Sequence, residues 1–108
     1  MNAMNPMNPI QFTTAVVEED VHLSLVELCR ACRAPEEQVR VWVVEGVLAP
    51  LGNSPREWRF AGPSLRRARL ALTLTQEFEI NAPGVALALD LLDEIAQLRA
   101  GLRRAGER

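Results

Sequence analysis

The acidic side chains near the end of the chain have a spacing that could do chemistry. Asp93 and Glu94 lie three and four residues after Asp90, which places each of them on one helical face with Asp90. Paired carboxylates of this kind can carry out acid–base chemistry or bind a metal ion. The same spacing is also typical of the solvated strip of a helix or of a charged contact surface, and we favour these two interpretations.

Two cysteines are the second candidate. Cys29 and Cys32 have the spacing of a redox pair or of half a zinc site. No second pair of cysteines follows, and the single histidine, His22, lies upstream in a segment predicted to be extended. Because helical spacing places both thiols on an apolar face, we interpret them as buried structural cysteines.

No set of residues in the sequence suits nucleophilic catalysis. Such a site needs a Ser, Cys or Thr beside a histidine that a third group orients. His22 stands between two apolar residues, and we expect it on the solvent side of a strand. A glycine-rich loop that could bind phosphate is also missing. We therefore predict a protein that is not an enzyme, with no metal site and no cofactor.

Charge is distributed unevenly along the 108 residues, which carry a formal net charge of −2 and no lysine. Residues 30–69 have a net charge of +4, so this segment is the only plausible polyanion-binding surface. No apolar run is long enough to span a membrane, and no signal peptide is recognisable, which predicts a cytoplasmic protein. We expect residues 1–12 to be a disordered tail, residues 13–104 to form one domain, and residues 105–108 to fray.

The elements that must position these residues begin with a short strand predicted over residues 10–17. Ser24 and Glu27 then form a capping box, which begins a helix that buries Leu25, Leu28 and the cysteines. Pro35 begins a second helix, which ends at Glu45 because Gly46 accepts a left-handed conformation. Two short helices joined by a tight connection predict a helix-turn-helix.

A β-hairpin and a third helix follow. Residues 47–51 and 56–60 flank a turn at residues 52–55, which predicts a small wing beside the helix-turn-helix. The third helix begins at residues 62–64 and extends to about Phe78, the last residue of its second apolar line. Arg66, Arg67 and Arg69 lie in its first turns. Cations there oppose the helix dipole, so we expect acidic neighbours or a partner.

The last helix covers residues of about 80–104, and Asn81 and Pro83 define its start. A surface helix needs one apolar stripe of roughly 100°. This helix has two apolar lines. One contains Val85, Leu89, Leu92, Ile95 and Leu102, and the other contains Leu87, Leu91 and Leu98. We predict that one of the two lines packs on the core and that the other forms a homodimer or contacts a client.

The outer face of the second helix separates two classes of partner. In a DNA-binding helix-turn-helix this face would enter the major groove. Two carboxylates would then approach phosphates, which is unfavourable, and outward valines favour a protein partner. DNA binding is therefore unlikely, although Arg40, Arg56 and Arg59 could touch a phosphate backbone or pair with nearby glutamates. The face carries Glu36, Glu37, Arg40, Val41 and Val44.

The segment V-R-V-W-V-V-E-G-V-L-A-P at residues 39–50 resembles the winged helix-turn-helix of MerR-type regulators. In that superfamily Arg40 would fall on a phosphate-contacting arginine, while Val41 and Trp42 replace two usual tyrosines. From about residue 21 to 103 the chain more closely resembles the CbpM family of chaperone modulators. The motifs are L-V-E-L-C at residues 25–29, G-V-L-A-P, W-R-F, and P-G-V-A-L-A-L-D-L-L-D-E-I-A-Q-L-R at residues 83–99.

The resemblance implies a mainly α fold, with a MerR-like winged helix-turn-helix, a small β-hairpin wing and a long C-terminal helix. It also implies binding to the J-domain of a CbpA/DnaJ-like co-chaperone, whose Hsp70-stimulating and DNA-binding activities would be inhibited. The alternative is a MerR-like DNA-binding transcriptional regulator. J-domains present a basic helix, so acids and apolar anchors are the candidate contacts. Trp58 is either such an anchor or packs on Phe60. The candidate partner-binding residues are Glu36, Glu37, Arg40, Val41, Val44, Trp58, Asp90, Asp93 and Glu94.

Overall fold

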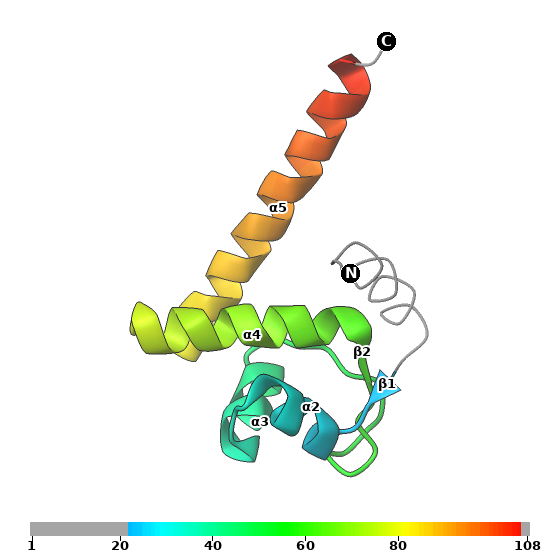
Figure 1. Cartoon of the computed structure of the whole chain (residues 1–108), viewed down its shortest axis with the longest axis vertical. Helices are drawn as coiled ribbons and strands as arrows, with labels where there is room; N and C mark the ends of the chain where they lie inside the picture. Colours follow the sequence, from blue (N-terminus) through cyan, green and yellow to red (C-terminus); the bar gives the residue numbers. More distant parts are fainter. Residues whose placement is uncertain (1–21, 107–108) are drawn as a thin grey trace, which may run out of the picture.

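The computed structural model describes residues 22–106 and is mainly helical (Figure 1). The predicted tail at residues 1–12 and the predicted strand at residues 10–17 lie outside the described residues. The predicted fold class, a helix-turn-helix with a long C-terminal helix, is confirmed. The elements are β1 (His22–Leu23), α2 (Leu25–Cys32), α3 (Glu36–Val44), β2 (Phe60–Ala61), α4 (Gly62–Glu77) and α5 (Ala82–Gly106).

The helix-turn-helix consists of α2 and α3. The predicted capping box is present: the backbone N–H of Glu27 donates to Ser24 Oγ at 3.2 Å, and the backbone N–H of Ser24 donates to Glu27 Oε1 at 2.8 Å. These bonds lower the pKa of the Glu27 carboxyl. The helix ends at Arg33, whose left-handed φ of 58° turns the chain towards Pro35, the N-cap of α3. A tight turn thus holds α3 against α2.

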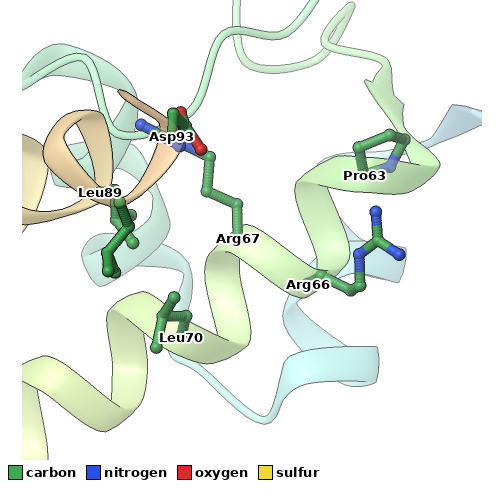
Figure 2. A pocket seen from close by; sticks show the side chains of 7 residues that line it. Pro63, Arg66, Arg67, Leu70, Leu89 and Asp93 are labelled. Atoms are coloured by element: carbon green, nitrogen blue, oxygen red, sulfur yellow. Dashed lines mark hydrogen bonds and ion pairs between the residues drawn. The ribbon is translucent and has the colours of Figure 1, made fainter. Parts of the chain in front are cut away.

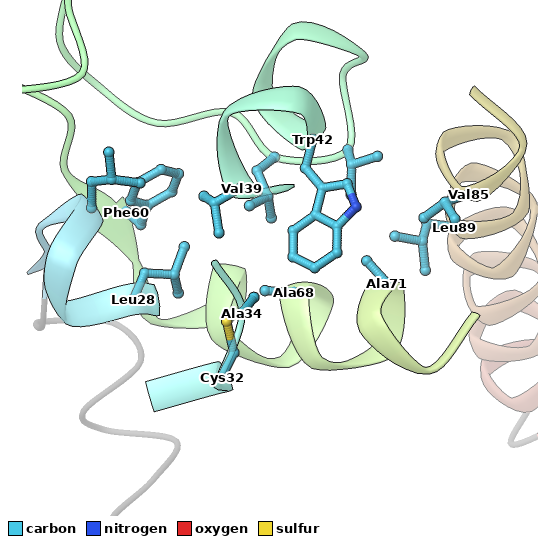
Figure 3. Close-up of a cluster of buried hydrophobic side chains, with 13 residues drawn as sticks. Leu28, Cys32, Ala34, Val39, Trp42, Phe60, Ala68, Ala71, Val85 and Leu89 are labelled. Carbon is cyan, nitrogen blue, oxygen red and sulfur yellow. The ribbon is translucent and has the colours of Figure 1, made fainter. Parts of the chain in front are cut away.

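One hydrophobic core unites the elements (Figure 3). Trp42 of α3 and Phe60 of β2 are its largest members, and both are fully buried. Leu28 of α2 and Val39 of α3 pack with them, and the small side chains of α4 let its backbone approach closely. The buried α4 and α5 members are Ala68, Ala71, Val85 and Leu89. Cys32 belongs to this core and Cys29 lies at its edge, as predicted.

The wing is present in a shorter form than the sequence predicts. Leu51 and Arg59 exchange two backbone hydrogen bonds, of 3.0 and 2.9 Å, in a single bridge. Val47 and Leu48 do not extend this pairing because they are buried behind α3, where both N–H groups donate to the Trp42 carbonyl. Beyond Arg59 the chain pairs with β1 instead, in antiparallel register with His22 opposite Ala61.

The path of α5 differs from the prediction. Asn81 caps it as expected, accepting from the backbone N–H of Gly84 at 2.9 Å. Only Val85 and Leu89 are buried, because the helix then leaves the rest of the molecule (Figure 1). The expected burial of one whole apolar line is therefore met only as far as Leu89, since Leu92, Ile95 and Leu102 are 44%, 45% and 73% exposed. The helix continues to Gly106, slightly beyond its predicted end.

Phe78, the approximate end of the predicted third helix, does not join the core. It is the C-cap of α4, with φ −110°, so the chain turns there and its side chain is 64% exposed. We refer below to residues 22–90 as the body and to residues 91–106, the projecting part of α5, as the arm.

Candidate partner-binding surfaces

The outer face of α3 gathers five of the candidate residues. At 3.6 residues per turn, positions 36, 37, 40, 41 and 44 fall within roughly 140° of one another. All five are exposed, with Val44 the most open of them at 80%. Val39 and Trp42, on the other side of the helix, are fully buried. The valines of this outer face therefore contribute little to the core and remain available to a partner.

The first turn of α3 is negatively charged. Pro35 caps it without a side-chain hydrogen bond, and Glu36 and Glu37 follow. The positive end of the helix dipole favours carboxylates there. Arg40 Nη2 lies 2.6 Å from Glu36 Oε2, and its Nε lies 3.1 Å from the same oxygen. Because both side chains are about half exposed, this pair contributes little to stability.

A shallow hollow lies beside this ion pair. It is lined by the start of α2, by Glu36 and Arg40 of α3, and by Pro55 and Arg56 of the wing. The cations that could meet a polyanion here, Arg40 and Arg56, therefore share their surroundings with a carboxylate. The pairing of Arg40 confirms the local alternative considered from the sequence.

Trp58 lies in the wing, apart from the α3 face. Its ring meets Phe60 edge to face, with centroids 6.0 Å apart and planes at 79°. Trp58 is half buried, while Phe60 is fully buried. The indole therefore fastens the wing to the core, and only its remaining edge can meet a partner.

Arg67 of α4 binds two of the three candidate acids in α5, of which Figure 2 shows Asp93. Its Nη1 lies 2.8 Å from Asp93 Oδ2 and its Nη2 lies 3.1 Å from Asp90 Oδ1. Its Nε donates to the backbone carbonyl of Val47, just beyond α3. One guanidinium thus connects α4, α5 and the exit of α3. The acidic neighbours expected for the arginines of α4 are confirmed for Arg67.

The role of Arg67 was missed from the sequence, although a signal for it existed. The sequence shows that Arg67 needs acidic neighbours and that Asp90 and Asp93 lie three residues apart. It does not show that α4 and α5 bring these side chains together. Both aspartates are still more than half exposed. Glu94, which directly follows Asp93 in α5, is exposed as well. This acidic strip therefore remains accessible beside its structural role.

An open hollow of about 500 Å³ lies where α4 and α5 diverge (Figure 2). Leucines form its apolar part and arginines its rim, and the Arg67 side chain extends across it towards Asp93. Its lining residues are Pro63, Arg66, Arg67, Leu70, Leu89, Leu92 and Asp93.

The arm carries an apolar line without a covering element among the described residues. Leu91, Ile95, Leu98 and Leu102 alternate spacings of four and three residues, which is the spacing of a coiled-coil seam. Their side chains are 54%, 45%, 61% and 73% exposed. A seam this open suits association with another helix.

The cysteines have no reactive environment. Both thiols are free, and burial raises the pKa of each, which keeps them protonated and weakly nucleophilic. Within residues 22–106, no three His, Cys, Asp or Glu side chains gather as they would around a metal ion. In the same range, no helix has the length and apolarity needed to cross a bilayer.

Comparison with known proteins places this arrangement in a family. Residues 23–105 match the family described as MerR HTH family regulatory protein. A chaperone modulatory protein CbpM from Coxiella burnetii (strain Dugway 5J108-111) is 38% identical over 88 residues, covering 82% of this chain and 83% of the relative. The chain belongs to the CbpM family. A CbpM protein from Pseudomonas putida (strain W619) is 40% identical over 80 residues, covering 74% and 79% of the two chains.

The CbpM relatives are named as chaperone modulators and not as enzymes. The family match covers the whole helix-turn-helix and nearly all of α5, including the arm. The arm is therefore a shared part of the family's architecture.

Proposed function

We propose that this protein binds the J-domain of a CbpA/DnaJ-like co-chaperone and inhibits both its stimulation of Hsp70 and its binding to DNA. The observation that carries the proposal is the exposed α3 face, where a helix-turn-helix presents two carboxylates and two valines beside one arginine. The names of the CbpM relatives support a chaperone-related role.

The chemistry of the α3 face suits a basic helix. Glu36 and Glu37 supply negative charge, and Val41 and Val44 supply apolar contact beside it. Charge complementarity speeds encounter and selects the partner, whereas buried apolar contacts supply most of the affinity. A protein that covers the basic helix of a J-domain in this way would exclude other ligands of that helix, which accounts for inhibition without catalysis.

We expect the remaining candidate residues to contribute less to J-domain binding. Glu94 is exposed, and Asp90 and Asp93 are more than half exposed although they bind Arg67. Trp58 offers only the edge that does not pack on Phe60. We therefore expect substitutions in the α3 face to weaken J-domain binding more than substitutions in α5.

Calorimetric titration with the J-domain encoded in the same genome tests the proposal. We expect binding in the micromolar range or tighter, reduced at least about tenfold by Glu36→Lys and less by Asp93→Lys. Glu77→Lys, at the exposed end of α4, is the matched control for the change of charge and should bind as the wild type does. Absence of heat and of complex at tens of micromolar would overturn the proposal.

Homodimer formation through the arm is part of the same proposal. The open seam from Leu91 to Leu102 supports it, because two such seams can cover each other. Light scattering should give twice the monomer mass for the wild type and the monomer mass for a Leu98→Asp variant. A wild type that stays monomeric at high concentration would refute the dimer.

A MerR-like DNA-binding regulator is the second candidate. The family match and the cations Arg40 and Arg56 beside α3 favour it. It predicts a salt-dependent gel shift on the promoter of its own gene, lost in Arg40→Ala. The cytoplasmic location predicted from the sequence stays a prediction under either function.

A further inference from the structure

We propose that Glu36 and Glu37 are the specificity determinants of the α3 face, which make this helix-turn-helix accept a cationic helix and reject nucleic acid. The inference rests on the proposed function for its cationic partner. Its second half, the rejection of nucleic acid, concerns the chemistry of the face itself.

The position of the two carboxylates is the first argument. In DNA-binding helix-turn-helix proteins the start of the second helix approaches the duplex, and backbone N–H groups together with the helix dipole attract phosphate. Here α3 begins at Pro35 without a side-chain cap, so this end would otherwise be positive. Glu36 and Glu37 occupy that first turn and place negative charge where a phosphate would lie.

The state of Arg40 is the second argument. Two of its guanidinium nitrogens contact the same oxygen of Glu36, one helical turn away. Arg56 lines the same hollow. Glu36 and Glu37 carry −1 each, and Arg40 and Arg56 carry +1 each, so these four side chains together have no net charge. Replacing both glutamates by glutamine would give these four side chains a net charge of +2.

The salt bridge alone does not hold Arg40 away from DNA. Both side chains are about half exposed, and ion pairs at such positions are weak. The decisive effect is the local charge. Each phosphate neutralised by a cation makes the logarithm of the affinity fall by about 0.9 per logarithmic unit of salt. Once the two carboxylates are neutralised, the two cations Arg40 and Arg56 should therefore give a slope of about −2.

The test compares the wild type, Glu36→Gln with Glu37→Gln, and Glu77→Gln with Glu79→Gln. Both double variants change the net charge equally, but the second pair lies at the turn between α4 and α5, away from α3. Each protein is titrated against a fluorescent duplex at about 50 and 200 mM salt, and separately against the J-domain. Circular dichroism checks that each variant keeps its helix content.

We expect the α3 variant to bind the duplex at least about tenfold more tightly than the wild type at low salt, and the J-domain at least about tenfold more weakly. Adding Arg40→Ala should remove part of the gain on DNA, because Arg56 remains. The control variant should match the wild type in both titrations.

Three outcomes overturn the inference: an equal gain on DNA by the control variant, no gain by the α3 variant, or wild-type affinity of the α3 variant for the J-domain. Failure of the wild type to bind the J-domain overturns the proposed function instead, and the DNA titrations then decide the rejection of nucleic acid by themselves.

Discussion

The body and the arm treat the same kind of side chain in opposite ways. In the body, Leu28, Val39 and Leu89 are at most 2% exposed. In the arm, Leu98 and Leu102 are 61% and 73% exposed, although they belong to the same helix as Leu89. Burying such a side chain fully contributes about 1.5–3 kcal/mol relative to exposure, and the arm leaves most of this unused. Its leucines therefore contribute little to the folding of one chain and are accessible to the association proposed above.

The contrast predicts that truncating Trp42 has the largest effect on stability. Trp42→Ala removes a fully buried ring from the centre of the core and should lower the free energy of unfolding by about 3–5 kcal/mol. Urea denaturation followed by circular dichroism measures the change. Trp42→Phe is the control. It should cost less, because the indole N–H makes no hydrogen bond within the described residues.

A loss below about 1 kcal/mol in Trp42→Ala would contradict the comparison, since cavities in well-packed cores cost more than that. It would mean that the body is as loosely packed as the arm.

The features that the sequence predicted correctly are local ones. The capping box of Ser24 and Glu27 joins residues three apart, and so does the bond from Gly84 to Asn81. Short-range rules suffice there, because the partners are fixed once the helix forms. The helix-turn-helix was also predicted from local features. The two helices each have an apolar face, and the connection between them is so short that the helices must pack on each other.

The errors concern contacts between distant segments. The apolar spacing of α5 shows which residues share a face but not how many turns lie against α4, so the sequence did not show that Ile95 lies beyond the core. The pairing of β1 with β2 and the approach of Arg67 to Asp93 depend on tertiary packing in the same way. For the α3 face, the sequence indicated which side is exposed, whereas the bond of Arg40 to Glu36 needed side-chain positions.

The second prediction concerns the junction between the two regions. Arg67→Ala removes a bond to the Val47 carbonyl and leaves Asp90 and Asp93 facing each other without a cation. Allowing for the solvent around both carboxylates, we expect a loss of about 1–2 kcal/mol in stability. Hydrogen exchange should also quicken in α5 around Asp90. Arg67→Lys should recover part of the charge effect but not all three contacts, because a lysine lacks the planar fork.

An Arg67→Ala variant with unchanged exchange in α5 would show that apolar packing of Val85 and Leu89 alone holds the arm to the body.

The third prediction lies at the edge of the body. Ser24→Ala removes the hydroxyl that accepts from the Glu27 N–H, and caps of this kind contribute about 1 kcal/mol. Thermal unfolding measures the change, and Ser24→Asp, which can still accept, should restore most of the loss. If alanine and aspartate unfold alike, the cap does not contribute to the stability of α2.

The fourth prediction compares two positions of one helix, and its variant in the arm has the smallest expected effect on stability. Leu89→Ala and Leu98→Ala make the same change in one helix, once in the body and once in the arm. Leu89 is 2% exposed, so its loss should cost about 2–5 kcal/mol, whereas the loss of Leu98 should change stability by less than about 0.5 kcal/mol in dilute protein. At high protein concentration, the variant in the arm should show an effect on self-association instead of on stability. Leu98→Ala should then weaken the self-association measured by sedimentation velocity, because high protein concentration favours the proposed dimer through the arm. Equal costs for the two variants in dilute protein would mean that the arm packs on its own body, and the distinction between the regions would fail.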